Sequence, residues 1–212
     1  MTEGDELVEE RAVNPVRGHG GPLLGELASL LSAHGLTVQQ VDLFAGVTGP
    51  GSFTGVRVGL STINALSWTL GKPACGIGSL RALAMNVAAE DGEVISPVVD
   101  ARKREVYAAA FRWVDGELEE VIPAMVLSAS DWVARLGQPA VFVGSGVAEY
   151  PEIFETAADD HVIHAACVAR LAYRAWVADP GALPPARPRY VRPSEAEVKF
   201  GLAPAHDPLA GV

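Results

Sequence analysis

A glycine-rich turn between a short apolar run and a helical pattern constrains the fold of this chain most. Residues 41–47 have the length and composition of a buried strand. Ser52 is a favourable N-cap, and Gly71 with Pro73 beyond it is a favourable stop, so we predict a helix between them. A strand, a glycine turn and a helix together point backbone N–H groups at a phosphate or a partner group. The candidate nucleotide-contacting residues in this turn are Gly49, Gly51 and Ser52. The alternative is a tight turn that binds nothing.

The predicted helix after Ser52 has two different faces. An apolar stripe suits the core, whereas Gly55 and Gly59, with Thr62 one turn later, form a face of small residues. Glycine costs up to about 1 kcal/mol in a helix interior relative to alanine, so two glycines four residues apart need a reason. Close approach of another helix is one reason, and close packing on the chain's own sheet is the other.

The rest of the chain alternates strand and helix patterns. Leucines at helical spacing after Pro22 predict a helix that stops near Gly35. Further helices are expected over residues 79–89, 128–136 and 165–178. Strands are expected over residues 7–13, 94–99, 105–113, 117–122, 140–143 and 162–163. We expect the strands over 94–99, 105–113 and 117–122 to form a meander, with turns at residues 100–104 and at Asp115-Gly116. A second glycine turn follows the strand 140–143 and resembles a nucleotide-contacting turn, with Gly144 and Gly146 as its candidate contacts.

These patterns predict an α/β protein with two similar lobes. We place the N-terminal lobe at residues 1–93, the C-terminal lobe at 94–179 and a proline-rich tail at 180–212. The tail holds seven of the chain's 15 prolines, which favours an extended or disordered segment.

Composition limits the classes of function. The chain has 26 acidic and 16 basic residues, a net charge of −10, which opposes general binding to nucleic acids. Two distant cysteines argue against a disulfide scaffold or a zinc ribbon, and no metal site is expected. Without a signal-like start or a long apolar run, we expect a soluble cytoplasmic protein with no membrane partner.

The glycine-rich segment, Gly-Pro-Gly-Ser-Phe-Thr-Gly-Val-Arg-Val-Gly from residue 49, resembles the signature of the bacterial TsaB family. The resemblance continues through Gly71-Lys72-Pro73 and residues 76–84, 98–107, 143–146 and 188–192. Members of that family are accessory subunits of the enzyme complex that attaches a threonylcarbamoyl group to the adenosine beside the tRNA anticodon. The resemblance implies the actin/sugar-kinase/Hsp70-like (ASKHA) fold, in which each of two lobes repeats a sheet-and-helix unit.

The same resemblance implies partners. The chain would pair with a TsaD-like catalytic subunit through the helices that start near Pro22 and Ser52, and the pair would recruit a TsaE-like ATPase. The same helices also support a homodimer, and tRNA would be met only through the complex. The interface residues expected from it are Leu23, Leu27, Leu30, Gly55, Gly59 and Thr62.

The resemblance further implies that this chain is not a catalyst and needs no cofactor. The catalytic TsaD subunit carries two metal-binding histidines four residues apart, and the matching positions here are Ser79 and Leu83. A leucine side chain cannot ligate a metal. The alternative function is a small phosphotransferase or ATPase of the same fold, which needs a metal-holding acid near the first glycine turn. Asp100, beside Arg102, is better explained by an ion pair that orders a turn.

One element of the family pattern is missing from this sequence. Members open with a strand of the type Ile-Leu-Ala-Leu-Asp-Thr-Ser, and nothing here matches it. Residues 2–5 fall where the second hairpin turn of the family lies. We therefore expect the N-terminal lobe to lack its first strand, because of a misplaced start or a truncated product.

The net charge of −10 predicts that tRNA does not bind tightly to this chain alone, because an acidic surface opposes the counterion-release contribution to affinity. A gel-shift titration of the purified chain with tRNA, repeated over a range of salt concentrations, measures this. Sub-micromolar, salt-sensitive binding without any partner would contradict the prediction.

Overall fold

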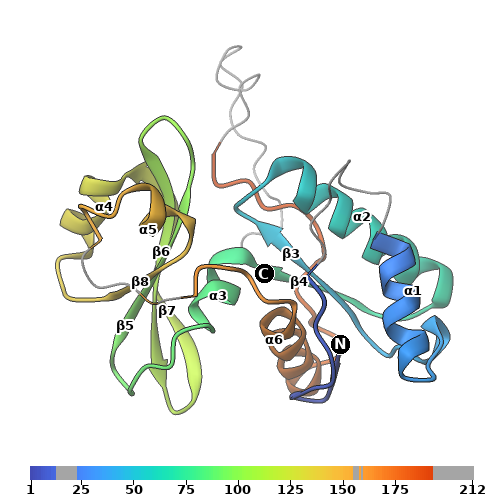
Figure 1. Ribbon diagram of the computed structural model, residues 1–212. Helices are drawn as coiled ribbons and strands as arrows, with labels where there is room; N and C mark the ends of the chain where they lie inside the picture. The colour runs from blue at the N-terminus through green and yellow to red at the C-terminus, as the bar shows by residue number, and fades with distance from the viewer. Residues whose placement is uncertain (13–22, 155–157, 159, 193–212) are drawn as a thin grey trace.

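The computed structural model describes residues 1–12, 23–154, 158 and 160–192, and its elements form two groups around two sheets (Figure 1). The first lobe, as we use the term, holds the parallel strands β3 (Phe44–Gly49) and β4 (Ala74–Gly78). Its helices are α1 (Leu23–Ala33), α2 (Phe53–Leu70) and α6 (Ala165–Ala178). The α/β class is confirmed.

The second lobe is a mixed sheet of four strands in the order β7-β6-β5-β8. Its elements are β5 (Val94–Asp100), β6 (Glu105–Val114), β7 (Glu117–Ser128), α4 (Ala129–Leu136), β8 (Val141–Val143) and α5 (Ser145–Glu149). β5, β6 and β7 form the predicted antiparallel meander, and β8 runs parallel to β5.

The two hairpin turns of the meander lie where the sequence places them. Asp115 and Gly116 both have positive φ, which matches the twist of a tight hairpin. In the other turn, Arg102, Lys103 and Arg104 all have φ near +60°. The Asp100 carboxylate accepts a hydrogen bond from the backbone N–H of Arg102 at 2.9 Å and pairs with its guanidinium at 3.4 Å. The predicted ion pair is therefore confirmed.

Helix α2 begins and ends as the capping residues predict. The Ser52 hydroxyl accepts a hydrogen bond from the backbone N–H of Gly55 at 3.2 Å, and Gly71 closes the helix in the left-handed conformation. The helix buries Val56 and Leu60 against the first sheet.

Helix α3 (Ser79–Ala84) lies between the two lobes and belongs to both cores (Figure 1). Ala82 packs in the first lobe, in a cluster with Cys75 and Ile77 of β4 and residues of α6. Leu80 and Leu83 pack in the second lobe with residues of β5, β6 and β8. One short helix thus joins the apolar interiors of the two lobes.

Several predicted boundaries are wrong. The helix predicted over residues 79–89 ends at Ala84, and residues 162–163 form no strand. The side-chain amide of Asn86 donates to the carbonyl of Val162 at 2.6 Å, so a side chain rather than a sheet ladder holds that segment. β7 extends to Ser128, six residues beyond the prediction, because it pairs with β6 along its length.

The start of the chain forms a small hairpin of β1 (Thr2–Glu3) and β2 (Glu6–Leu7), instead of the strand predicted over residues 7–13. Val13 lies outside the described residues. The hairpin rests on α6, where Arg170 donates to the backbone carbonyl of Asp5 at 2.8 Å. The absence of a first strand from the N-terminal lobe stays a prediction.

The lobe boundaries at residues 93 and 179 also stay predictions. Helix α6 follows the second sheet in sequence, yet it packs on β3 and β4. Among the described residues, no helix is both long and apolar enough to cross a membrane.

Because α3 serves both cores, we expect Leu83→Ala to lower the free energy of unfolding by about 2–5 kcal/mol, the usual cost of a buried leucine. Leu83 is 1% exposed. The matched control is Leu24→Ala, since Leu24 is 55% exposed on α1 and its truncation should change stability by less than about 0.5 kcal/mol. Urea unfolding monitored by circular dichroism measures the free energy of unfolding of both variants. Equal losses of stability in Leu83→Ala and Leu24→Ala would contradict the role of α3.

Candidate partner-binding site

The outer surface of α1 and α2 carries very few charges. α1 has one charged residue, Glu26, and α2 has one, Arg57, whereas charged residues make up 20% of the chain. Depletion of charge distinguishes the centre of a protein interface from ordinary surface. The exposed parts of these helices therefore have the composition of a contact surface.

Large apolar side chains on these helices face solvent. Trp68 of α2 is 89% exposed and Leu24 of α1 is 55% exposed, and Leu23 and Phe53 are exposed as well. Leu30 and Leu31, by contrast, point inward and are buried. Of the predicted interface leucines, Leu23 is thus exposed, Leu27 is half-buried and Leu30 belongs to the interior.

An apolar groove of about 360 Å³ lies between the two helices. It is lined by side chains of α1, of the loop and the 3-10 helix η1 (Val38–Gln40) after it, and of α2, namely Leu24, Leu27, Ala28, Leu31, Leu36, Thr37, Val38, Gln39 and Leu66. Leu24 and Leu27 therefore share one surface with Leu66 of α2.

The small-residue face of α2 is open. Within residues 1–12, 23–154, 158 and 160–192, a Cβ atom built on Gly59 would meet no atom within 4 Å, and one on Gly55 would meet only Ser52 of its own cap. Thr62 turns its hydroxyl back to the carbonyl of Val58 at 2.9 Å, so its donor is already satisfied within the helix. Among the residues that the structure describes, the first sheet therefore makes no close contact at these two glycines, so close packing on that sheet does not explain them.

The two candidate nucleotide turns lie in different lobes. Gly49 has φ +99°, and a Cβ there would lie 3.2 Å from the carbonyl oxygen of Arg189. Gly144 has φ +116°, and a Cβ there would overlap the carbonyl of Val98. A Cβ on Gly146 would lie 3.1 Å from the same Val98 oxygen. Glycine at each of these three positions thus has a packing reason that needs no ligand.

Ser79 and Leu83, which take the positions of the catalytic relative's histidines, are both buried in α3. Among the residues that the structure describes, no group of three or more histidine, cysteine, aspartate or glutamate side chains is arranged to hold a metal ion.

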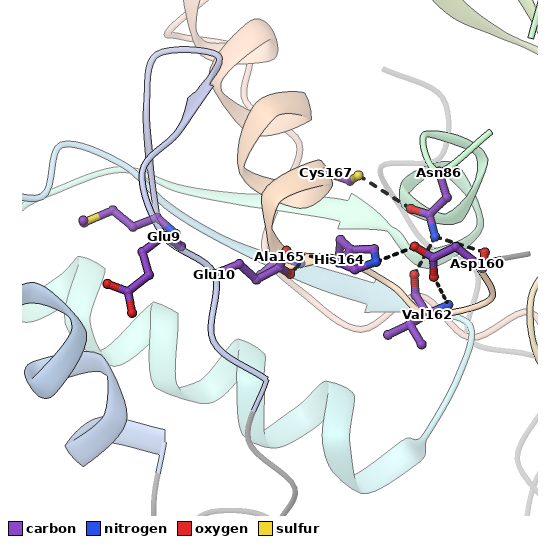
Figure 2. Close-up of polar contacts among 9 residues, drawn as sticks. Glu9, Glu10, Asn86, Asp160, Val162, His164, Ala165 and Cys167 are labelled. Carbon is purple, nitrogen blue, oxygen red and sulfur yellow. Dashed lines mark hydrogen bonds and ion pairs between the residues drawn. The ribbon is translucent and has the colours of Figure 1, made fainter. Parts of the chain in front are cut away.

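A histidine held between two carboxylates fixes the start of α6, and sequence reasoning did not anticipate it (Figure 2). His164 places Nε2 2.7 Å from Asp160 and Nδ1 3.1 Å from Glu10. These contacts, that to Asp160 first, raise the pKa of His164, because both favour the imidazolium. Glu10 also accepts the backbone N–H of Ala165 at 2.6 Å, so it caps α6 from a distant part of the chain. The hydrogen bond from the backbone N–H of Val162, followed by that to His164, lowers the pKa of Asp160.

Cys167 lies near this histidine but is no nucleophile of a cysteine–histidine pair. Its thiol points to the Asn86 amide oxygen at 3.6 Å, while the ring of His164 points to the carboxylates (Figure 2). Burial raises the pKa of Cys167 and raises that of Cys75 to about 11. Both thiols are therefore protonated and unreactive near neutral pH.

The chain matches a family model described as "TsaD: tRNA N6-adenosine threonylcarbamoyltransferase" over residues 13–177. It is 30% identical to "tRNA threonylcarbamoyladenosine biosynthesis protein TsaB" of Bacillus subtilis, over 71% of this chain and 67% of that protein. It is 31% identical to the protein of the same name from Haemophilus influenzae, over 66% of this chain and 63% of that protein. The chain thus spans about two thirds of the length of these relatives.

The fold matches a solved structure from Pseudomonas aeruginosa described as an uncharacterized protein with similarity to peptidase YEAZ. The TM-score is 0.70 at 29% sequence identity, and the match covers 83% of this chain and 85% of that one.

His164 predicts how stability changes with pH. Because its folded-state pKa is raised, its contacts stabilise the fold fully below about pH 6.5, its unfolded pKa, and this contribution is lost as pH rises through the folded pKa. We expect His164→Asn to be less stable than the parent at pH 5.5 and to lose less stability between pH 6 and 8. Urea unfolding at stepwise pH measures this, and parallel curves for the two proteins would contradict it.

Proposed function

This chain belongs to the TsaB family, and from that premise we propose that it is an accessory subunit in the synthesis of threonylcarbamoyladenosine in tRNA. It has no catalytic activity of its own and uses no cofactor. It binds a TsaD-like catalytic subunit, and the pair recruits a TsaE-like ATPase. The protein acts in the cytoplasm and meets tRNA only within the complex.

The proposed contact surface is formed by α1 and α2. The observation that carries the proposal is the open, charge-poor face of α2, where no atom of the described part of the chain lies within 4 Å of a Cβ built on Gly59. A helix of the partner can approach such a face more closely than one covered by large side chains. The exposed Leu23 and Leu24, with the groove beside them, offer the apolar area that drives association.

The same surface supports a homodimer when the partner is absent, because two copies of a helix pair can pack as four helices. In the complex the catalytic subunit takes the place of the second copy. The two states compete for one face, so a single substitution on that face should weaken both.

We expect Gly59→Leu to abolish association with the TsaD-like subunit and leave the fold intact. A leucine holds the partner helix beyond its packing distance of about 8–10 Å, and such overfilling costs ~1–3 kcal/mol, roughly ten- to a hundredfold in affinity. A pull-down with the organism's TsaD-like subunit and circular dichroism on the same preparation measure both properties.

The matched control is Ala134→Leu, which adds a leucine to an exposed position of α4 in the second lobe. It should bind like the parent. If Gly59→Leu folds and binds its partner normally, the assignment of this face is wrong. If Gly59→Leu unfolds, the face packs on the chain itself.

A further inference from the structure

The segment after α6 begins as a packed part of the first lobe. The backbone N–H of Gly76 donates to the carbonyl of Pro184 at 2.9 Å. The side-chain amide of Asn64 donates to the carbonyl of Ala186 at 2.7 Å, and Ala186 is buried in a small apolar cluster with α2. Residues 184–186 are therefore fixed to the first lobe by hydrogen bonds and by burial.

The next residues follow the carboxyl end of β3. The backbone N–H of Arg189 donates to the carbonyl of Thr48 at 2.8 Å. The Tyr190 hydroxyl accepts a hydrogen bond from Nε of Arg57 at 2.8 Å, and the Arg57 guanidinium lies 3.7 Å from the centre of the Phe53 ring. The rings of Phe53 and Tyr190 are 5.8 Å apart. Arg57 thus binds the tail through a hydrogen bond to Tyr190 and a contact of 5.6 Å with the centre of its ring, while it also lies over Phe53 of its own helix.

The segment then reaches the second lobe (Figure 1). Arg192 donates from Nη1 to the carbonyl of Ala101 at 3.0 Å and from Nη2 to the carboxylate of Glu105, which begins β6. Its guanidinium also lies 5.9 Å from the centre of the Tyr107 ring. These are charge-assisted contacts on the turn that follows β5, in the other lobe from Arg57.

We propose that residues 188–192 are a latch that fastens the two lobes to each other across the carboxyl ends of β3 and β5. Arg192 is its attachment to the second lobe. Helix α3 joins the lobes at their base, so motion between the lobes pivots there and opens the side that the latch crosses. The three residue steps from Arg189 to Arg192 span at most about 11 Å, so the latch cannot stay attached at both ends when the lobes separate.

The latch gives a role to two arginines, Arg57 and Arg192, that the proposed partner contact does not use. Arg57 belongs to the glycine-rich segment, yet its described contacts are with Phe53 and Tyr190. Arg192 closes the segment 188–192, and its described contacts are in the second lobe. Arg57 binds the latch to the first lobe, and Arg192 binds it to the second lobe.

The distance between the lobes tests the latch. Nitroxide labels on cysteines introduced at Ala65 of α2 and Ala134 of α4, both exposed, report the separation by pulsed electron paramagnetic resonance. The native Cys75 and Cys167 are buried, so the introduced thiols label selectively. We expect one narrow distribution in the parent and a broader, longer one in Arg192→Ala.

Hydrogen exchange gives a second readout on the unlabelled protein. The amide of Arg189 should exchange at least about tenfold faster in Arg192→Ala, the change expected when a charge-assisted hydrogen bond no longer resists local opening. The matched control is Arg189→Ala, which removes a cation from the same segment but keeps the backbone bond to Thr48. Its distances should equal those of the parent.

A second variant guards against a misfolded preparation. Glu105→Gln keeps Arg192 and the shape of its partner but removes the charge, so it should shift both readouts in the same direction by a smaller amount. Parent-like distances and exchange in Arg192→Ala and in Glu105→Gln would overturn the latch. Equal effects of Arg189→Ala and Arg192→Ala would also overturn it, because net charge and not the contact would then be the cause.

Discussion

The burial of α3 on two sides is the constraint on which the rest of this structure depends. Five of its six residues are buried, with Ala82 in one core and Leu80 and Leu83 in the other. The remaining residue, Arg81, donates to the carbonyl of Leu118 and lies 5.8 Å from the centre of the Phe111 ring, so it too contacts the second lobe. A helix with no free face cannot rotate or slide without opening one core, so the lobes stay joined at this point.

The elements that depend on local signals are predicted well from the sequence. Ser52 and Gly71 bound α2, and Asp115-Gly116 closes a hairpin, because caps and tight turns need only neighbouring residues. The contacts of the N-terminal segment with α6 are a different matter. Glu10 accepts a hydrogen bond from Ala165, which lies 155 residues later in the chain, and no periodic pattern in the sequence predicts such a pair. The shortage of charge on α1 and α2 could have been found by counting charges along each predicted helix. The exposure of Trp68 could not have been found in this way.

The glycine turns show where a sequence pattern stops being informative. Gly144 and Gly146 suggest a nucleotide turn, yet the carbonyl of Val98 lies close to the Cβ position of both, Val106 also approaches that of Gly146, and Gly144 has a positive φ. A contacted phosphate and a close strand demand the same residue type. Gly59 is the opposite case, because no described residue occupies the space that its missing side chain leaves. Only the surrounding atoms distinguish a glycine needed by the fold from one that leaves room for something else.

The return of α6 to the first lobe has a consequence for how the chain is made. The second core comes mainly from one continuous stretch, from α3 to Phe154, whereas the first core needs Val168, Leu171 and Ala172 beside Cys75 and Ile77. Because synthesis proceeds from the N-terminus, β3 and β4 emerge from the ribosome well before the helix that covers them. The second lobe can therefore complete its core while the first still waits for α6. Nascent β3 and β4 therefore expose apolar surface during that interval.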